Sequence, residues 1–120
     1  MGKGNSKALS RDYSAIAQGI KIIERDPFND ISLEEIAAMC NISSAGFRRN
    51  FKKYLGESPV QYRTKLKIKA MQYMLEHSNV TVEEMSELLG INNATYVYKM
   101  FKKSVGASPK EYRNRFKNNF

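Results

Sequence analysis

An internal repeat limits the folds open to this chain more than any other feature of its sequence. Nine residues of the segment 45–67 recur at an offset of 50. Upstream, the two copies align at an offset of 49, which pairs Glu34-Glu35 with Glu83-Glu84. A repeat of this length indicates one supersecondary unit built twice. The recurring residues are Phe51-Lys52-Lys53, Gly56, Ser58-Pro59, Tyr62-Arg63 and Lys67, which return as Phe101-Lys102-Lys103, Gly106, Ser108-Pro109, Tyr112-Arg113 and Lys117.

Positive charge is concentrated in the later part of each copy. The 120 residues carry a formal net charge of +8. Residues 1–40 hold 5 Lys and Arg against 6 Asp and Glu, residues 41–80 hold 8 against 2, and residues 81–120 hold 7 against 4. Clustered positive charge on a folded domain is typical of nucleic-acid binding. A surface that serves solubility alone is the alternative interpretation.

Composition and motifs argue against several other classes of protein. No apolar run approaches the ~18 residues that span a membrane, and no secretory signal follows the polar start. The single cysteine, Cys40, excludes an internal disulfide framework and a multi-cysteine zinc site. The sequence shows no catalytic triad, metal cluster or phosphate loop, so we expect no enzymatic activity, no cofactor and no metal. A reducing cytoplasm fits this cysteine usage best.

Hydrophobic periodicity and helix-capping signals predict an all-α chain of about seven helices. Ser32 and Thr81 each open a capping box that ends in a glutamate, and the Ser58-Pro59 and Ser108-Pro109 pairs open further helices. The expected organisation is a disordered segment or linker over residues 1–10, a first helix-turn-helix unit over residues 11–57, a connecting helix over residues 58–77 and a second unit over residues 78–120.

Each copy combines a short capped helix, a tight turn at Asn41 or Gly90, and a second helix with a basic outer face. In a helix-turn-helix the second helix lies in the major groove and the first braces it across the backbone. The helical spacing of the apolar residues in the second helix of each copy leaves one row, or stripe, of residues on the side that faces away from the core. These stripes are Ala45, Arg48, Arg49 and Lys52 in the first copy and Thr95, Tyr98, Lys99 and Lys102 in the second.

The chain resembles the AraC/XylS family of bacterial transcription regulators. The resemblance rests on the Phe-Lys-Lys, Gly, Ser-Pro and Tyr-Arg pattern, seen twice, with one extra residue in the second turn. It implies two homeodomain-like three-helical repeats joined by a long central helix, each reading one of two successive major grooves. Gly46 stands where family members often carry a larger residue. The base-contacting residues implied by position are Ala45, Arg48, Arg49, Ala94, Thr95, Tyr98 and Lys99.

Phosphate contacts are expected from helix N-termini and from basic side chains. Helix N-termini offer free amides and a partial positive charge to backbone oxygens. The expected N-terminal contacts are Ser32, Ser43, Thr81 and Asn92, and the expected side-chain contacts are Lys52, Lys53, Arg63, Lys102, Lys103 and Arg113.

The expected function is sequence-specific binding of double-stranded DNA by a bacterial transcription regulator, with activation as the expected direction. RNA polymerase is an expected partner, and so is an N-terminal effector or receiver domain outside this chain. A small stand-alone activator is the alternative organisation. A non-specific nucleic-acid binder or a protein-interaction module is the alternative function. A DNA-repair methyltransferase of the Ada type needs zinc-binding cysteines that this sequence lacks.

Overall fold

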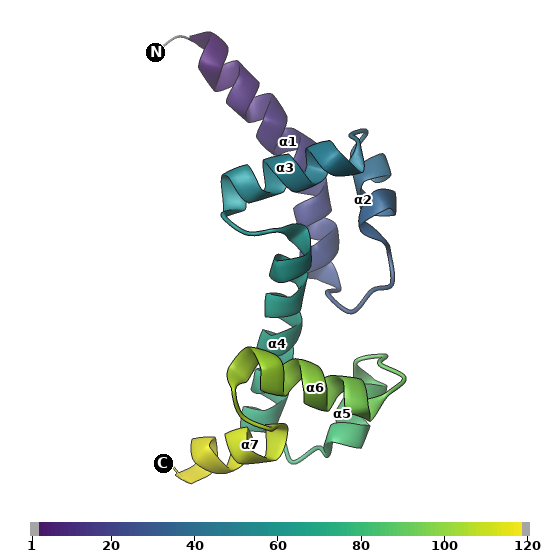
Figure 1. Ribbon diagram of the computed structural model, residues 1–120, viewed down its shortest axis with the longest axis vertical. Helices are drawn as coiled ribbons and strands as arrows, with labels where there is room; N and C mark the ends of the chain where they lie inside the picture. Colours follow the sequence, from purple (N-terminus) through teal and green to yellow (C-terminus); the bar gives the residue numbers. More distant parts are fainter. Residues whose placement is uncertain (1–2, 119–120) are drawn as a thin grey trace. The chain divides into compact units, whose positions relative to one another are not determined.

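The computed structural model describes the backbone of residues 3–118 and the side chains of residues 11–117. Within these residues the chain forms seven α-helices and no strand, which confirms the predicted all-α fold (Figure 1). They form two compact units, of residues 1–65 and 66–120, and α4 begins in one and ends in the other. The helices are α1 (Lys3–Arg25), α2 (Leu33–Met39), α3 (Ser44–Leu55), α4 (Pro59–His77), α5 (Val82–Leu88), α6 (Ala94–Val105) and α7 (Pro109–Asn118).

The beginning of α1 differs from the prediction. The sequence favours a disordered segment or linker over residues 1–10, but α1 starts at Lys3, and residues 1 and 2 lie outside the described part. Helix extension adds one backbone hydrogen bond per ordered residue once a nucleus exists. The buried stretch of α1 supplies that nucleus. No helix within the described residues is long and apolar enough to cross a membrane.

The core of the first unit lies where α1, α2 and α3 contact one another. Ile16, Ile20 and Ile23 recur at helical spacing, and their burial orients α1. Gly19 lies on the same helix against α3, where an added Cβ would come within 2.5 Å of the Phe47 ring. The absence of a side chain at Gly19 therefore allows α1 and α3 to approach closely.

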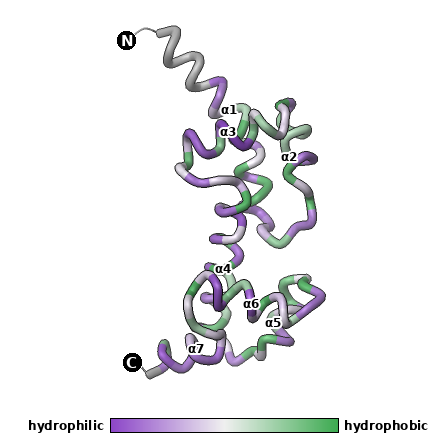
Figure 2. The backbone as a smooth tube through the Cα atoms, in the orientation of Figure 1, coloured by the Kyte–Doolittle hydropathy of each residue, from purple (hydrophilic) through white to green (hydrophobic). Residues whose placement is uncertain are grey.

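The second unit repeats this arrangement with its own core. Met71 and Leu75 at the end of α4 are buried, as are Met85 on α5 and Val97 and Phe101 on α6. Apolar positions alternate with polar ones along these helices (Figure 2). Each unit thus has a separate apolar interior built from the same kind of helix faces.

The turn between α2 and α3 and the turn between α5 and α6 use left-handed backbone. Asn41 has φ of 58° and Gly90 has φ of 73°, as the sequence predicts for the residue that ends each short helix. Asparagine and glycine tolerate this conformation better than other residues. The second turn holds one residue more, since five residues separate α5 from α6 and four separate α2 from α3.

Side-chain caps fix the helix starts. Thr81 and Glu84 form the full reciprocal capping box, whereas Ser32 accepts the Glu35 amide without a recorded return bond. Two further reciprocal boxes, between Ser58 and Gln61 and between Ser108 and Glu111, go beyond the serine caps that the sequence predicts at α4 and α7. Each such bond satisfies an amide that the helix leaves unpaired.

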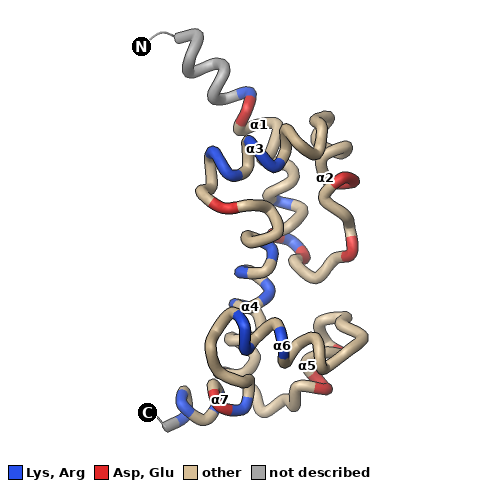
Figure 3. The backbone as a smooth tube through the Cα atoms, in the orientation of Figure 1, with Lys and Arg blue, Asp and Glu red and all other residues tan. Residues whose placement is uncertain are grey.

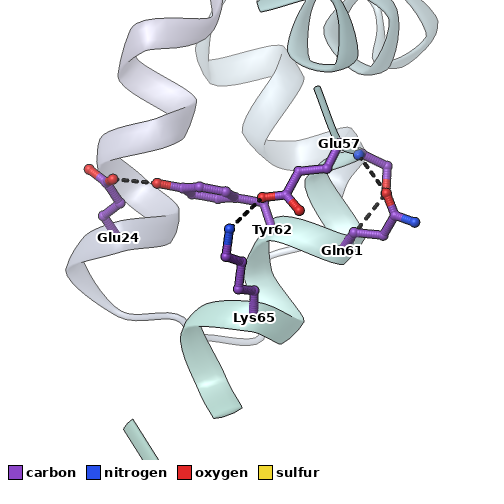
Figure 4. A network of polar contacts seen from close by, with 6 residues as sticks. Glu24, Glu57, Gln61, Tyr62 and Lys65 are labelled. Carbon is purple, nitrogen blue, oxygen red and sulfur yellow. Dashed lines mark hydrogen bonds and ion pairs between the residues drawn. The ribbon is translucent and has the colours of Figure 1, made fainter. Parts of the chain in front are cut away.

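In each unit one tyrosine links the helix that precedes the helix-turn-helix to the helix that follows it. The Tyr62 hydroxyl on α4 donates to Glu24 on α1 (Figure 4), and the Tyr112 hydroxyl on α7 donates to Glu76 on α4. The rings pack edge-on against Phe51 and Phe101 at the C-terminal halves of α3 and α6. Both tyrosines therefore have packing roles. The bond to Glu24 raises the pKa of Tyr62 to about 12, and burial with the bond to Glu76 raises the pKa of Tyr112 to about 12.

Candidate nucleic-acid interface

Helices α3 and α6 occupy the same place in the two units. Each has 12 residues, and each follows a seven-residue helix and a tight turn. α3 buries Phe47 and Phe51, and α6 buries Val97 and Phe101. The two residues that follow each of these buried positions are exposed, and these are the residues that a second helix of a helix-turn-helix presents to a major groove.

The exposed face of α3 carries the residues that the sequence places there. Ala45, Arg48, Arg49 and Lys52 are all exposed. Arg48 is engaged within the unit, because its Nη2 lies 3.2 Å from Oε1 of Glu34 on α2. No ion pair is recorded for Arg49 within the described residues. Arg49 is therefore the exposed arginine of α3 for which the described residues show no ion pair.

Gly46 has a local reason to lack a side chain. An added Cβ would lie 3.1 Å from both Ile42 and the Ser43 hydroxyl, which itself accepts the Gly46 amide at 3.0 Å. This contact is tighter than ordinary packing, so the first turn of α3 is shaped around a glycine.

The exposed face of α6 combines tyrosines with lysines. Thr95, Tyr98, Lys99 and Lys102 are exposed as predicted, and Ala94 is half-buried. Tyr96 is also 49% exposed, more than the 40% of Tyr98, although it lies off the predicted stripe. Its counterpart in the first unit is Gly46, so the repeat gave no sign of an aromatic side chain here. The first unit thus offers arginines and the second offers aromatic rings.

The start of α6 requires a correction. The sequence places the helix N-terminus at Asn92, but the N-cap is Asn93, whose side chain accepts the Thr95 amide at 2.9 Å. An asparagine oxygen reaches an amide two residues ahead of it, so the second of the two asparagines takes the cap. The amides of this helix therefore start one residue later than predicted, and Asn92 is an exposed turn residue.

The four helix N-termini differ in local charge. The first turns of α2 and α5, capped by Ser32 and Thr81, hold two glutamates each. The bonds from Thr81 keep the pKa of Glu84 below its ordinary value, so this carboxylate stays charged. No acidic residue lies in the first turn of α3, capped by Ser43, or of α6. The local charge is therefore more favourable to an anion at the starts of α3 and α6 than at those of α2 and α5.

The expected phosphate-binding side chains fall into two groups. Lys52, Lys102 and Lys103 are exposed without a recorded ion pair among the described residues, while Lys53 lies 3.8 Å from Asp12. Arg63 and Arg113 are half-buried, and they donate to backbone carbonyls of Ile31 and Leu75. Their guanidinium groups donate inside the units, where buried backbone carbonyls need hydrogen-bond donors. This placement argues against the phosphate contacts that the sequence predicts for Arg63 and Arg113.

Charge separates along the helices of each unit. Lys and Arg positions occur on α3 and α6, whereas α2 and α5 carry Glu but no Lys or Arg (Figure 3). Within each helix-turn-helix the positive charge therefore lies on the second helix, where it attracts a polyanion.

The described residues offer no competing chemical site. They contain no group of three His, Cys, Asp or Glu side chains placed to hold a metal ion. Cys40 is half-buried, and this burial raises the pKa of its thiol. His77 stacks on Tyr73 with ring centroids 4.4 Å apart at the end of α4. The exposed helix faces remain the best candidate for a functional surface.

Comparisons with known proteins agree with this geometry. A family model described as a helix-turn-helix domain matches residues 36–115. The MmsAB operon regulatory protein of Pseudomonas aeruginosa is 33% identical over 85 residues, which are 71% of this chain and 28% of that protein. The C-terminal domain of AraT, a response regulator from Geobacillus stearothermophilus, superposes with a TM-score of 0.78 at 26% identity over 84% of each chain.

A second solved structure shares the fold. It is the DNA-binding domain of AdpA in complex with a target DNA, with a TM-score of 0.78, 23% identity and coverage of 88% of this chain and 96% of that one. Fold and exposed helix faces together define a double helix-turn-helix domain of the DNA-binding class. The chain belongs to the AraC/XylS family of transcription regulators. It spans less than half the length of the curated relatives that it matches.

Proposed function

We propose that this chain binds double-stranded DNA sequence-specifically and regulates transcription, with α3 and α6 entering two successive major-groove segments of one operator. The observation that carries the proposal is the exposure of two similar helix faces, rich in donors, at the same place in two copies of one unit. Arginine and lysine read guanine, and apolar or methyl groups contact the thymine methyl.

The proposed contacts follow from exposure and charge. The proposed base-contacting residues are Ala45, Arg48, Arg49, Ala94, Thr95, Tyr98 and Lys99. Phosphate contacts are proposed for Lys52, Lys53, Lys102 and Lys103 and for the amides that open α3 and α6. Tyr96 joins the base-contacting residues because of its exposure on α6. We expect the phosphates to supply most of the affinity and the base edges to supply the specificity.

The wider role is also proposed. The chain acts as the DNA-binding output of a larger cytoplasmic regulator, in which an effector or receiver domain supplies the signal and RNA polymerase receives it. The greater length of its relatives supports this organisation. The match to a domain of the response regulator AraT supports a receiver domain as one form of input.

The test is selection of bound sites from a random duplex library at ~150 mM salt, which is close to physiological. The expected result is two enriched blocks with centres about ten base pairs apart, one for each unit. A single enriched block would remove one unit from base reading. Absence of enrichment, or equal binding to single-stranded RNA, would replace the proposal by a non-specific nucleic-acid module.

A further inference from the structure

Glu34 and Arg48 connect the first helix of a helix-turn-helix to its second helix. Nη2 of Arg48 lies 3.2 Å from Oε1 of Glu34, and the two side chains are 50% and 65% exposed. An ion pair this exposed adds little to folding stability, because water screens it. Its main effect is therefore on the orientation of the Arg48 side chain.

The carboxylate engages only one edge of the guanidinium group. The recorded contact uses Nη2 alone, and arginine has five N–H donors in a planar fork. The donors that Glu34 leaves free stay available on the exposed face of α3. A fork already held at one edge loses less conformational freedom when it binds a base, which favours one geometry of contact.

The second unit lacks this pair. Glu83 corresponds to Glu34 at the offset of 49, but the residue that corresponds to Arg48 at the offset of 50 is Tyr98. Both α2 and α5 thus place a carboxylate in their first turn, while only the first unit joins it to an arginine. Glu34, which pairs with an arginine, can therefore be compared within one chain with Glu83, which faces no arginine at the corresponding position.

We propose that Glu34 is a positioning residue for Arg48 and sets the base preference of the first unit. This inference rests on the proposed function, since it needs α3 to face DNA bases. A carboxylate near the groove repels the phosphates of every sequence alike. Glu34 therefore lowers affinity for random DNA and, through Arg48, sharpens the choice of base at one position.

The experiment measures binding of the full chain to its selected operator and to duplexes with one base changed at each position. The variants are Glu34→Gln, Arg48→Ala, their combination, and Glu83→Gln as the matched control. We expect Glu34→Gln to reduce discrimination at one first-unit position by about fivefold, the low end for an arginine–guanine contact. The same change adds nothing in the Arg48→Ala background. Both glutamine variants bind random duplex more tightly.

Three possible results distinguish a failure of this inference from a failure of the proposed function. Unchanged discrimination in Glu34→Gln overturns the positioning role, and so does a similar loss in Glu83→Gln, which would reflect charge alone. In both cases the unchanged chain still selects its operator, so the proposed function stands. An unchanged chain that prefers no sequence overturns the proposed function and this inference together.

Discussion

The phenolic hydroxyl of Tyr62 donates a 2.5 Å hydrogen bond to Glu24, 38 residues upstream, and Tyr112 makes the equivalent bond to Glu76, 36 residues upstream. In each unit the bond joins a helix before the helix-turn-helix to the helix that follows it. The tyrosine ring also packs on a phenylalanine of the second helix of the motif, Phe51 on α3 or Phe101 on α6. Each tyrosine therefore helps to hold α3 or α6 in position relative to the helices that precede and follow the motif.

Removing either hydroxyl should weaken the fold. Tyr62→Phe and Tyr112→Phe keep the ring contacts and lose a hydrogen bond to a carboxylate, so we expect each to lower the free energy of unfolding by about 1.5–3 kcal/mol. Tyr73→Phe is the matched control, because Tyr73 is 65% exposed and no hydroxyl bond is recorded for it. Urea denaturation measures the change, and equal effects at all three positions would contradict a specific role for these bonds.

The same bonds predict a loss of stability in alkali. The folded-state pKa of Tyr62 and of Tyr112 is about 12, above the ordinary value of 10.0. A raised pKa means that the folded state favours the protonated phenol, so this contribution is fully present below about pH 10 and disappears as pH rises through about 12. Denaturation at several pH values in this window should show a steeper fall for the unchanged chain than for the Tyr62→Phe/Tyr112→Phe variant. Parallel curves would refute the linkage.

Gly19→Ala should destabilise the first unit even though alanine favours helix formation. The new Cβ would lie 2.5 Å from Cε1 of Phe47, a buried ring that cannot swing into solvent. Overpacking of this kind costs about 1–3 kcal/mol, which exceeds the gain of up to about 1 kcal/mol in helix propensity. Thermal unfolding followed by circular dichroism measures the cost. Phe47→Leu in the same chain should recover part of it, and a stabilised Gly19→Ala variant would show that α1 and α3 can separate.

DNA affinity should depend steeply on salt if the proposed interface is right. With ~6–10 phosphate contacts, affinity falls by ~10³–10⁵ between 50 and 200 mM salt. Lys102→Ala should weaken binding to all sequences alike and reduce the salt slope by about 1. Lys21→Ala, an exposed lysine of α1, is the control that should leave the slope unchanged. Fluorescence anisotropy titrations at several salt concentrations provide both numbers.

Arg49→Ala should act differently from Lys102→Ala. A base-reading arginine contributes discrimination, so its removal should cost about 1–3 kcal/mol on the operator and relax the preference at one position. Competition with single-base operator variants measures this preference. A uniform loss across all variants would make Arg49 a phosphate contact instead.

Local chemistry explains what the sequence could predict. Ser-Pro pairs, glycines and the apolar spacing of residues such as Phe47 and Phe51 depend on neighbours within one or two turns, and they located the helices and the exposed stripes. Contacts between segments that lie far apart in the sequence could not be predicted from these local patterns. The repeated Tyr-Arg dipeptide looks like a basic surface motif, yet Arg63 turns inward to the Ile31 carbonyl. The pairing of Arg48 with Glu34 likewise depends on how α2 packs against α3.

The tyrosine–glutamate bonds also bear on how the two halves of the chain can be recombined. The offset of 49 that aligns the segments upstream of each turn aligns Glu24 with Tyr73, while the actual partner of Tyr112 is Glu76. A chimaera that joined one half to the other by sequence alignment would set a second tyrosine opposite the phenol and leave its hydroxyl without the carboxylate. Grafts between the duplicated halves therefore have to follow contacts in space, because the glutamate that accepts the tyrosine bond lies three residues further along in the second copy than the upstream alignment predicts.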